Sequence, residues 1–346
     1  MVYSCHLHKE TNFKQPLEQE IIDYFFAALM LPGDMKISDS IRASSVTRTL
    51  NLIGDKWTLV ILRDAFLGVR RFQDWQRRNG MAKSLLTNRL KKLVEYGCLE
   101  KVLYQDRPMR FEYHLTEMGR DLFPLSLLMW EWERQWMPEN TTLPGELVHK
   151  NCGKTFHPLT TCDQCQGQVH IRNTRYVLGP GSGFDEKMPP RHQRRSRLPT
   201  KVADNSYIFE QCVDIIGDRW STMVLAAAYF GGKRFDEFLQ ELQIAPNILS
   251  NRLTSLVECE IFRKALYCEK PPRYEYRLTE KGRQIFGVAV GMMMWGDKWL
   301  ADKRGKPHIL VHVDCGKQMK PQVTCSECGE VLVPGDILYK RPPMNR

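Results

Sequence analysis

The chain has 346 residues, enough for two or three ordinary domains, and a hydrophobic share of 42% allows each domain to bury a core. It carries 50 basic against 40 acidic side chains, and this net charge of +10 favours polyanionic partners such as nucleic acid or an anionic membrane surface. No run approaches the ~18 apolar residues of a membrane span, and the first residues lack the basic-then-apolar order of a signal peptide. The composition argues against a disordered, secreted or membrane-spanning protein and predicts a cytoplasmic one.

The chain contains one sequence unit twice. Residues 44–169 recur as residues 207–332 without an insertion or a deletion, so that Trp57 reappears 163 positions later as Trp220. The same offset relates glycines, aromatic residues, an Asn-Arg-Leu triplet and four potential metal ligands, and chance does not keep so many residue types in one register. A period of this length indicates a duplicated domain, since solenoid repeats are about 20–50 residues long.

The segment before the repeats, residues 1–41, contains an apolar run at 21–31 that predicts one helix. Each repeat then begins with a helix through the tetrapeptide Gly-Asp-(Lys/Arg)-Trp, at 54–57 and 217–220. We expect the tryptophan of this motif to anchor a core, because large aromatic side chains dominate the burial in small domains.

The middle of each repeat combines two helices with a hairpin. A short helix is predicted at 71–75 and 234–238, and two β-type runs with a basic tip predict a hairpin at 100–115 and 265–278. Between them lies an amphipathic helix with a polar opposite face, whose first turn tolerates Pro246. Its apolar stripe has i, i+4, i+7 and i+8 spacing in both copies: Leu86, Leu90, Leu93 and Val94, then Leu249, Leu253, Leu256 and Val257.

A longer helix follows each hairpin. Thr116 and Thr279 can cap a new helix, while Pro124 and Gly287 occupy corresponding positions further on. Proline and glycine both break or bend helices, so we predict a kink at this point. The helices are apolar on more than one side, which predicts that one face packs on its own domain and the other on a partner helix.

Glycines and prolines at 179–183 indicate a linker between the repeats, and the basic run at 187–201 could either contact phosphates or be solvated. The predicted boundaries are an N-terminal extension at 1–41, a first helical domain at 42–138, a first metal-binding segment at 139–172, a linker at 173–203, a second helical domain at 204–301, a second metal-binding segment at 302–336 and a tail at 337–346.

Four potential metal ligands close each repeat. His149-x-x-Cys152 and Cys162-x-x-Cys165 form two close pairs, a spacing with which imidazole and thiolate groups close a tetrahedron around Zn²⁺. The whole set recurs as His312, Cys315, Cys325 and Cys328. We predict one structural zinc ion in a small zinc-ribbon-like segment of each repeat, with all four ligands from that repeat. The alternative is a set of reduced structural cysteines without metal.

No catalytic chemistry is indicated. A thioredoxin-like role would need a low-pKa thiolate at the start of a helix in a βαβ setting, which neither Cys-x-x-Cys pair has. We find no phosphate-cradling glycine loop and no credible pair of nucleophile and base, so we predict that the protein is not an enzyme. The remaining cysteines lack a cysteine counterpart in the other repeat, which argues against a shared disulfide: Cys5, Cys98, Cys212, Cys259 and Cys268.

The predicted order of helix, helix, turn, polar-faced helix and hairpin is typical of a winged helix-turn-helix. The motifs Gly-Asp-Lys-Trp, Arg-Phe-x-Asp, Leu-x-x-Arg-Leu-x-x-Leu-Val-Glu and Pro-x-Arg-x-x-Tyr-x-Leu-Thr-x-x-Gly-Arg make both repeats resemble the HxlR family of bacterial transcription regulators. This resemblance implies a mainly α fold with a small amount of β structure, built from tandem winged helix-turn-helix domains. Even the His-x-x-Cys-Gly and Cys-x-x-Cys segment is similar to a tail of some members.

Two departures from the family pattern matter. Members are usually single-module chains that dimerise through their terminal helices, whereas this chain supplies both modules and resembles a built-in dimer. Some members sense oxidants or electrophiles through a cysteine at the position where this chain has Ser44 and Tyr207, so thiol sensing is not carried over.

The polar face of the amphipathic helix is the predicted recognition surface. Asparagine can pair with adenine edges, arginine with guanine, and hydroxyls with bases or phosphates. The two helices present different residues, so we expect related but unequal half-sites about one helical turn (~34 Å) or a multiple of it apart. The candidates are Ser84, Thr87, Asn88, Arg89 and Lys91 on the first helix, Asn247, Ser250, Asn251, Arg252 and Thr254 on the second, and Arg107, Arg110 and Arg273 on the hairpins.

The sequence therefore predicts a sequence-specific DNA-binding transcriptional regulator that acts as a covalent pseudo-dimer on a pseudo-palindromic operator in double-stranded DNA. The alternative is a protein-interaction adaptor that uses the zinc segments and the Met/Trp-rich long helices without specific DNA binding. The N-terminal extension could pair two chains, and apolar space between the long helices could admit a small-molecule effector that the sequence does not name.

Overall fold

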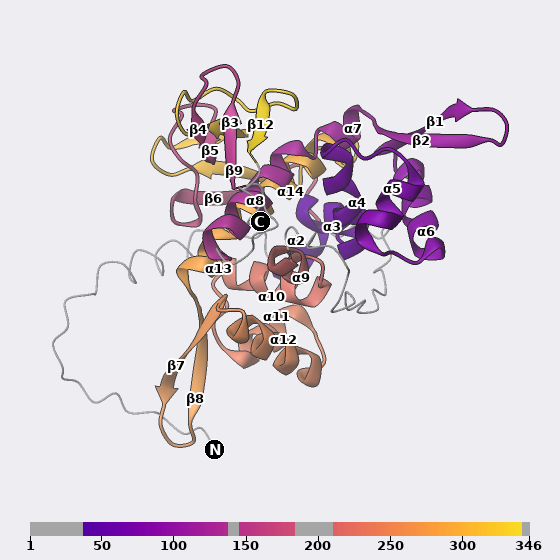
Figure 1. Cartoon of the computed structure of the whole chain (residues 1–346). Coiled ribbons are helices and arrows are strands. Elements are labelled where there is room, and N and C mark those ends of the chain that lie inside the picture. The colour runs from indigo at the N-terminus through magenta and orange to yellow at the C-terminus, as the bar shows by residue number, and fades with distance from the viewer. Residues whose placement is uncertain (1–36, 138–144, 184–209, 341–346) are drawn as a thin grey trace, which may run out of the picture.

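The structure is a computed structural model in which each repeat forms a helical lobe with a projecting two-stranded hairpin (Figure 1). The lobes meet along their long helices, beside a module of short strands. The helix predicted at 21–31 and the basic run at 187–201 lie outside the described residues. The structure describes residues 37–137, 145–183 and 210–340.

Apart from the first described helix, which has no described counterpart, the two repeats share one order of elements. The strands are short and most of the regular structure is helical, which confirms the predicted mainly α class. None of the described helices is both long and apolar enough to cross a membrane. The first repeat contains α2 (Ile37–Ala43), α3 (Ser45–Ile53), α4 (Lys56–Phe66), α5 (Phe72–Asn79), α6 (Lys83–Glu95), β1 (Leu99–Gln105), β2 (Arg110–Leu115), α7 (Glu117–Arg120), α8 (Phe123–Trp136), β3 (Glu146–His149), β4 (Thr155–Phe156), β5 (Pro158–Cys162) and, after a short 3₁₀ turn, β6 (Thr174–Leu178). The second contains α9 (Glu210–Ile216), α10 (Arg219–Tyr229), α11 (Phe235–Leu242), α12 (Pro246–Glu258), β7 (Phe262–Cys268), β8 (Arg273–Leu278), α13 (Glu280–Gln284), α14 (Phe286–Trp299), β9 (His308–His312), β10 (Lys317–Met319), β11 (Pro321–Cys325) and β12 (Ile337–Lys340).

The Gly-Asp-(Lys/Arg)-Trp motif starts helices α4 and α10. The Asp55 and Asp218 carboxylates each accept a hydrogen bond from the backbone amide three residues further on, at 3.2 and 2.8 Å, and so cap these helices. Trp57 is buried as predicted, whereas Trp220 is only half-buried and lies beside the guanidinium group of Arg219. The tryptophan is therefore a core anchor in the first repeat but not in the second.

Helices α6 and α12 bury the predicted apolar stripe against their own lobes. The leucines of both stripes are almost completely buried, while Val94 and Val257 lie at the edge and are half-buried. Pro246 occupies the first turn of α12, where a missing amide costs no intrahelical hydrogen bond. This packing leaves the opposite face of each helix in solvent.

Each hairpin is tied to its lobe through an arginine that contacts both of its strands. The Arg71 guanidinium donates a hydrogen bond to Glu112 on β2 (2.9 Å) and lies 4.6 Å from the ring centre of Tyr104 on β1. The corresponding Arg234 contacts a glutamate and a tyrosine of the second hairpin in the same way. Because one cation contacts both strands, it fastens the hairpin to the lobe at the middle of β2 and the outer part of β1.

The chain breaks between two helices at the position of the predicted kink, so that prediction of one bent helix was wrong. Thr116 accepts a hydrogen bond from the amide of Gly119 and caps the short helix α7, and α8 then begins separately. Pro124 lies in the first turn of α8 and Gly287 in the first turn of α14, where neither residue interrupts a ladder of hydrogen bonds. A Cβ atom on Gly119 would lie 2.0 Å from the carbonyl oxygen of Cys98, which explains the glycine of the Leu-Thr-Glu-x-Gly-Arg motif.

Tryptophans on the long helices lock the two lobes together in a reciprocal manner. The indole of Trp132 on α8 donates to the carbonyl oxygen of Lys281 (3.1 Å), and its counterpart Trp295 on α14 donates to that of Met118 (2.9 Å). The predicted contact of one helix face with a partner helix is thus confirmed. A second reciprocal pair lies one turn further on, from Trp136 to the side chain of Gln284 and from Trp299 to that of Asp121.

The crossing of α8 and α14 brings together two residues that occupy the same position in the two repeats. Gly291 packs against Leu128, and a Cβ atom on Gly291 would lie 3.1 Å from the Cδ1 atom of Leu128 and 3.2 Å from the Cα atom of Leu125. The leucine of one copy therefore fills the space that the glycine of the other copy leaves.

The metal-binding segments form one interlocked module. Strand β5 pairs antiparallel with its own counterpart β11, with Thr160 opposite Val323 at the centre of the ladder. On either side, β6 pairs with β9 and β12 pairs with β3, so each outer ladder also joins one repeat to the other. The module extends through β6 and β12 into residues that the sequence assigned to the linker and the tail. The expectation of two separate segments is therefore corrected, because the backbone hydrogen bonds of each are completed by the other repeat.

The close crossing of α8 and α14 predicts that a large side chain at position 291 destabilises the protein. Gly291→Leu should destabilise the protein by about 1–3 kcal/mol through overpacking against α8. Added Leu128→Ala should recover part of this loss, since it removes the side chain that the new leucine meets. Gly287→Ala is the matched control on the same helix: its Cβ atom would have only the Thr160 hydroxyl, at 3.8 Å, within contact range. This control should stabilise the protein by about 0.4–1 kcal/mol. Urea unfolding measures all four chains, and equal stability of Gly291→Leu and the unchanged chain would contradict the close crossing.

Candidate nucleic-acid interface and metal centres

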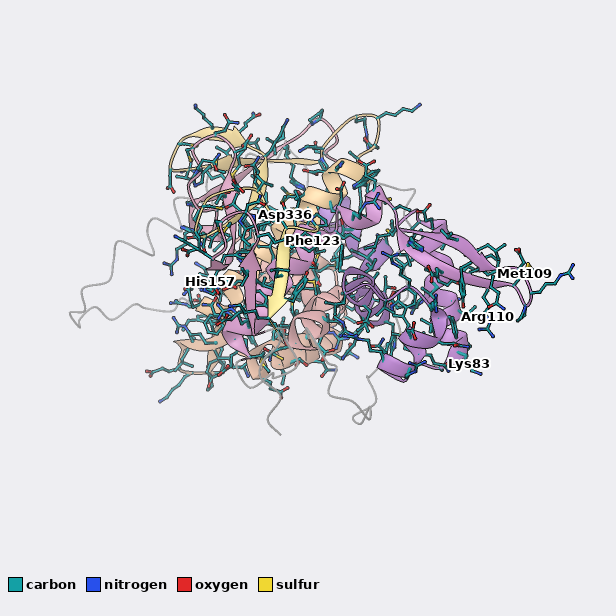
Figure 2. The ribbon with its side chains drawn as sticks, turned by 45° about the horizontal axis from the view of Figure 1, so that its top comes forward. Lys83, Met109, Arg110, Phe123, His157 and Asp336 are labelled. Atoms are coloured by element: carbon teal, nitrogen blue, oxygen red, sulfur yellow. The ribbon has the colours of Figure 1, made fainter. Side chains whose placement is uncertain are left out.

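Helix α6 presents a polar face to solvent at the outer end of the first lobe. Its N-terminal end is free of apolar cover, and the predicted contact residues on it are exposed: Ser84, Thr87, Asn88 and Lys91. Lys83, at the first position of the helix, is also exposed, and the sequence analysis did not select it. In Figure 2, Lys83 lies on the same outer side of the molecule as Arg110 at the hairpin tip.

Helix α12 presents the corresponding face of the second lobe with different chemistry. The predicted residues Asn247, Ser250, Asn251 and Thr254 are exposed. The counterpart of Lys83 is Pro246, so this helix begins without a cation. The two faces therefore share asparagine and hydroxyl groups but differ in charge.

Arg89 and Arg252, the arginines of the Asn-Arg-Leu triplets, point into the protein, whereas the other predicted contacts point into solvent. The Nε atom of Arg89 is 2.8 Å from the Asp55 carboxylate, and the Nε atom of Arg252 donates to Asp218 at the same distance. Both side chains are largely buried, with 21% and 13% exposure. Each arginine thus ties its recognition helix to the N-terminal cap of the preceding core helix. The sequence pattern alone does not distinguish such a positioning arginine from one that contacts a base.

The hairpin tips carry exposed cations and exposed apolar side chains. Arg107, Arg110 and Arg273 are exposed as predicted, and Figure 2 shows Arg110 and Met109 at the far end of the first hairpin. Met109 is 71% exposed. Further cations on the strands, which the sequence analysis did not select, are Lys101, Arg263 and Lys264. An arm with this composition can contact phosphates and the walls of a groove.

The eight predicted metal ligands gather in two clusters, but each cluster takes ligands from both repeats. One consists of His149, Cys152, Cys325 and Cys328, and the other of Cys162, Cys165, His312 and Cys315. The predicted grouping of four ligands within one repeat was therefore wrong. Its physical cause is the pairing of β5 with β11, which carries the second cysteine pair of each repeat to the His-x-x-Cys turn of the other.

The distances within both clusters fit tetrahedral coordination. The four potential ligand atoms lie within 4.8 Å of one another in each cluster. The Sγ atoms of Cys152 and Cys325 are 4.0 Å apart, and Cys328 Sγ is 3.3 Å from His149 Nδ1. In the other cluster, the corresponding distances are 4.0 and 3.1 Å. Metal–sulfur bonds of ~2.3 Å place two sulfurs of a tetrahedron about 3.8 Å apart, close to these values.

Backbone amides around the clusters favour the thiolate forms that a metal requires. The amides of Gln164 and Glu327 point at the first sulfur of each Cys-x-x-Cys pair, both at 3.4 Å. A hydrogen bond from the Lys317 amide lowers the pKa of Cys315 to about 7. Burial raises the pKa of Cys162, and that of Cys325 to about 11, and a bound cation would oppose this effect.

Carboxylates lie behind both histidines. The Nε2 atom of His312 is 3.3 Å from Asp314, and that of His149 is 3.9 Å from Glu330, while the Nδ1 atoms face the sulfurs. A carboxylate on the second ring nitrogen orients a metal-binding imidazole. His157 and His170, the other histidines of this region, belong to neither cluster.

The remaining described cysteines form no disulfide and lie outside the clusters. Cys98 and Cys212 are completely buried. Burial raises the pKa of Cys98 to about 12 and raises that of Cys212 well above its usual value. These thiols are packing groups and not reactive ones.

Two lobes with exposed polar helix faces and basic hairpins define a DNA-binding protein of the winged helix-turn-helix class. The sequence model of the HxlR-like helix-turn-helix family matches residues 52–141 and 215–304, more than half of the chain. The protein belongs to the HxlR-like family and carries its domain twice, as the sequence motifs predicted. Transcriptional regulation by DNA binding is the function of this class of protein.

The chain is similar to several proteins of this kind. An uncharacterized HTH-type transcriptional regulator of Mycobacterium tuberculosis is 40% identical over 152 residues, which cover 44% of this chain and 95% of that protein. The HTH-type regulator YdeP of Bacillus subtilis is 35% identical and covers 26% of this chain and 71% of its own length. The reduced form of the Bacillus subtilis transcriptional regulator YodB is 30% identical, with a TM-score of 0.25, and covers 26% of this chain and 90% of its own.

The cross-repeat grouping of ligands predicts the metal content of two double variants. Cys152→Ser with Cys325→Ser damages one cluster and leaves the other whole, so one metal ion per chain should remain. Cys152→Ser with Cys162→Ser damages both clusters, so neither ion should be held tightly. Each variant removes two thiols, which makes the pair a matched comparison. Elemental analysis after desalting counts the ions, and a grouping within each repeat would interchange the two results.

Proposed function

We propose that the protein is a sequence-specific transcriptional regulator that binds double-stranded DNA as a covalent pseudo-dimer. The observation that carries this proposal is the pair of exposed polar helix faces, on α6 and α12, held in one frame by the reciprocal contacts of α8 and α14. The operator is then pseudo-palindromic, with half-sites about one helical turn (~34 Å) or a multiple of it apart. The net charge of +10 supports binding to the phosphate backbone.

The two half-sites are expected to be unequal. Lys83 and Lys91 of the first helix correspond to Pro246 and Thr254 of the second. The first lobe therefore brings more positive charge to the DNA, while Asn88 and its counterpart Asn251 can each form paired hydrogen bonds with adenine. A shared asparagine with different flanking groups favours two related half-sites of different affinity.

We further propose that both clusters hold structural Zn²⁺. Three cysteines and one histidine form a closed four-ligand set of the type that zinc prefers in structural sites. When bound, the metal would fasten a His-x-x-Cys turn of one repeat to a Cys-x-x-Cys turn of the other. Its role is then to hold the two repeats in a fixed relation, and no catalytic step is assigned to it.

The adaptor alternative is less well supported, because the Met/Trp-rich helices do not form an exposed surface for a protein partner. The Met/Trp-rich helices α8 and α14 bury most of these side chains between the lobes, with Met129, Trp132, Met292 and Trp295 each no more than 3% exposed. Such residues stabilise the chain and are not available to a protein partner. The relatives are named as transcriptional regulators, which supports the same choice and favours a function without enzymatic activity.

Selection of bound sequences from a random duplex pool tests the proposed operator. We expect an enriched site with two related, unequal halves. Asn88→Ala should relax base preference in one half and Asn251→Ala in the other, each at a cost of about 1–3 kcal/mol. Arg110→Ala on the hairpin is the contrasting variant, because loss of a phosphate contact should weaken all sequences evenly and reduce the salt slope by about 1. Binding of DNA without any enriched sequence would reject the proposal of sequence-specific binding.

The motif arginines call for a separate test. Because Arg252 is held by Asp218, we expect it to position α12, and both Arg252→Ala and Asp218→Asn should then weaken specific binding by similar factors. Asparagine preserves the helix cap, so this variant removes the charge pairing without removing the cap. Electrophoretic mobility shifts with the selected operator measure both. If only Arg252→Ala loses binding, and base preference changes with it, the arginine reads DNA directly.

A further inference from the structure

An apolar pocket lies between the two repeats, away from the predicted DNA surface and the metal clusters. It is formed by α3 of the first repeat, by α10 and α14 of the second, and by strands β6 and β9. It contains about 1170 Å³ of atom-free space, which includes open solvent at its mouth. Its wall is built mainly from Tyr229, Phe230, Phe286, Met292, Met293 and Leu310.

Among the described residues that line the pocket, Arg219 is the single charged side chain, and none is a carboxylate. Its Nε atom is buried and makes no hydrogen bond within the described part of the chain. The neighbouring Asp218 is engaged by Arg252 and by a helix amide, and Asp214 is engaged by Lys56. A guanidinium group at an apolar wall, without a carboxylate partner among the described residues, is therefore the distinctive chemical feature of the pocket.

Several other polar groups of the lining are engaged within the protein. The hydroxyls of Ser44 and Thr47 both donate to the carbonyl oxygen of Ile41, and the Thr222 hydroxyl donates to backbone oxygens of its own lobe. Burial lowers the pKa of His308 to about 4, so this histidine is neutral at pH 7 and bonds to Ser40. These groups offer no competing charge to a bound molecule.

The electrostatic environment of Arg219 favours an anion. Burial lowers the pKa of its guanidinium group, and the nearby Arg42 lowers it further. A carboxylate or another anionic group beside Arg219 would offset both effects, because it would solvate the buried cation and screen the two like charges.

The corresponding region of the first repeat is filled by larger or charged side chains. Position 226 is alanine where the first repeat has Arg63, and position 293 is methionine where it has Trp130. Arg63 and Trp130 are both buried, and Arg63 pairs with Asp64 at 2.7 Å. The small residues of the second repeat thus open space that the first repeat closes.

We infer that this pocket binds one small organic acid per chain, with its apolar body against the aromatic and methionine wall and its anionic group on Arg219. The ligand would contact α3 of one repeat and α10 and α14 of the other. If the protein is the DNA-binding regulator proposed above, occupation of the pocket would alter the relative orientation of the two recognition helices. The binding site itself does not depend on that function.

The test uses the full-length chain without DNA, so that its result is independent of the operator. Isothermal titration calorimetry with 2-naphthoate should give saturable binding of one molecule per chain. The neutral analogue 2-naphthylmethanol, which has the same ring system, should bind about tenfold more weakly or worse, since it lacks the charge-assisted hydrogen bond. Equal affinity of the acid and the alcohol, or no saturable binding of either at millimolar concentration, would overturn the inference.

Variants locate the site. Arg219→Gln should lose the preference for the acid, whereas Lys320→Gln, at an exposed position outside the pocket lining, should leave it unchanged. Met293→Trp introduces the residue that the first repeat carries and should abolish binding of both probes. Ala226→Leu fills the same space by a smaller change. It provides an independent test if the Met293→Trp variant does not fold. Undiminished binding in folded forms of both filling variants would place the probe elsewhere and reject the pocket.

Discussion

The pairing of β5 with β11 is the constraint on which the rest of the structure depends. A strand that pairs antiparallel with its own repeat counterpart creates a local pseudo-two-fold axis at Thr160 and Val323. Around this axis, the cysteine pairs exchange partners, the outer strands cross between repeats, and the long helices meet with reciprocal tryptophan hydrogen bonds. The relative position of α6 and α12 follows from this exchange.

The shared frame contains two different sets of side chains. Glu133 is completely buried and accepts hydrogen bonds from the amides of Gln211 and Cys212 at the start of α9. Its counterpart is Gly296, whose Cβ atom would lie 2.5 Å from the carbonyl oxygen of Ser45 on α3. One lobe is thus fastened by a buried carboxylate and the other by close backbone contact. Such differences leave the fold symmetric while its two halves are packed in different ways.

Much of this organisation could be predicted from the sequence, because local patterns determine it. The leucine stripe of α6, the threonine caps and the His-x-x-Cys and Cys-x-x-Cys spacings each depend on residues close together in the chain. The exchange of cysteine pairs between the repeats could not be predicted. Because both repeats carry the same four ligands, the sequence allows a metal site within one repeat as readily as a site shared by two. The inward orientation of Arg89 was also hidden, because its partner Asp55 lies in another helix and its motif fits a DNA contact equally well.

The meeting of Leu128 with Gly291 has an evolutionary consequence. In an assembly of two identical chains, a residue on the symmetry axis meets a copy of itself, and every mutation there occurs on both sides at once. After two copies have been joined in one gene, the sides mutate separately. A large residue can then be matched by a small one, and a cavity can open in one copy while the other keeps its original packing. Fusion therefore allows one half to acquire a new property while the other preserves the old one.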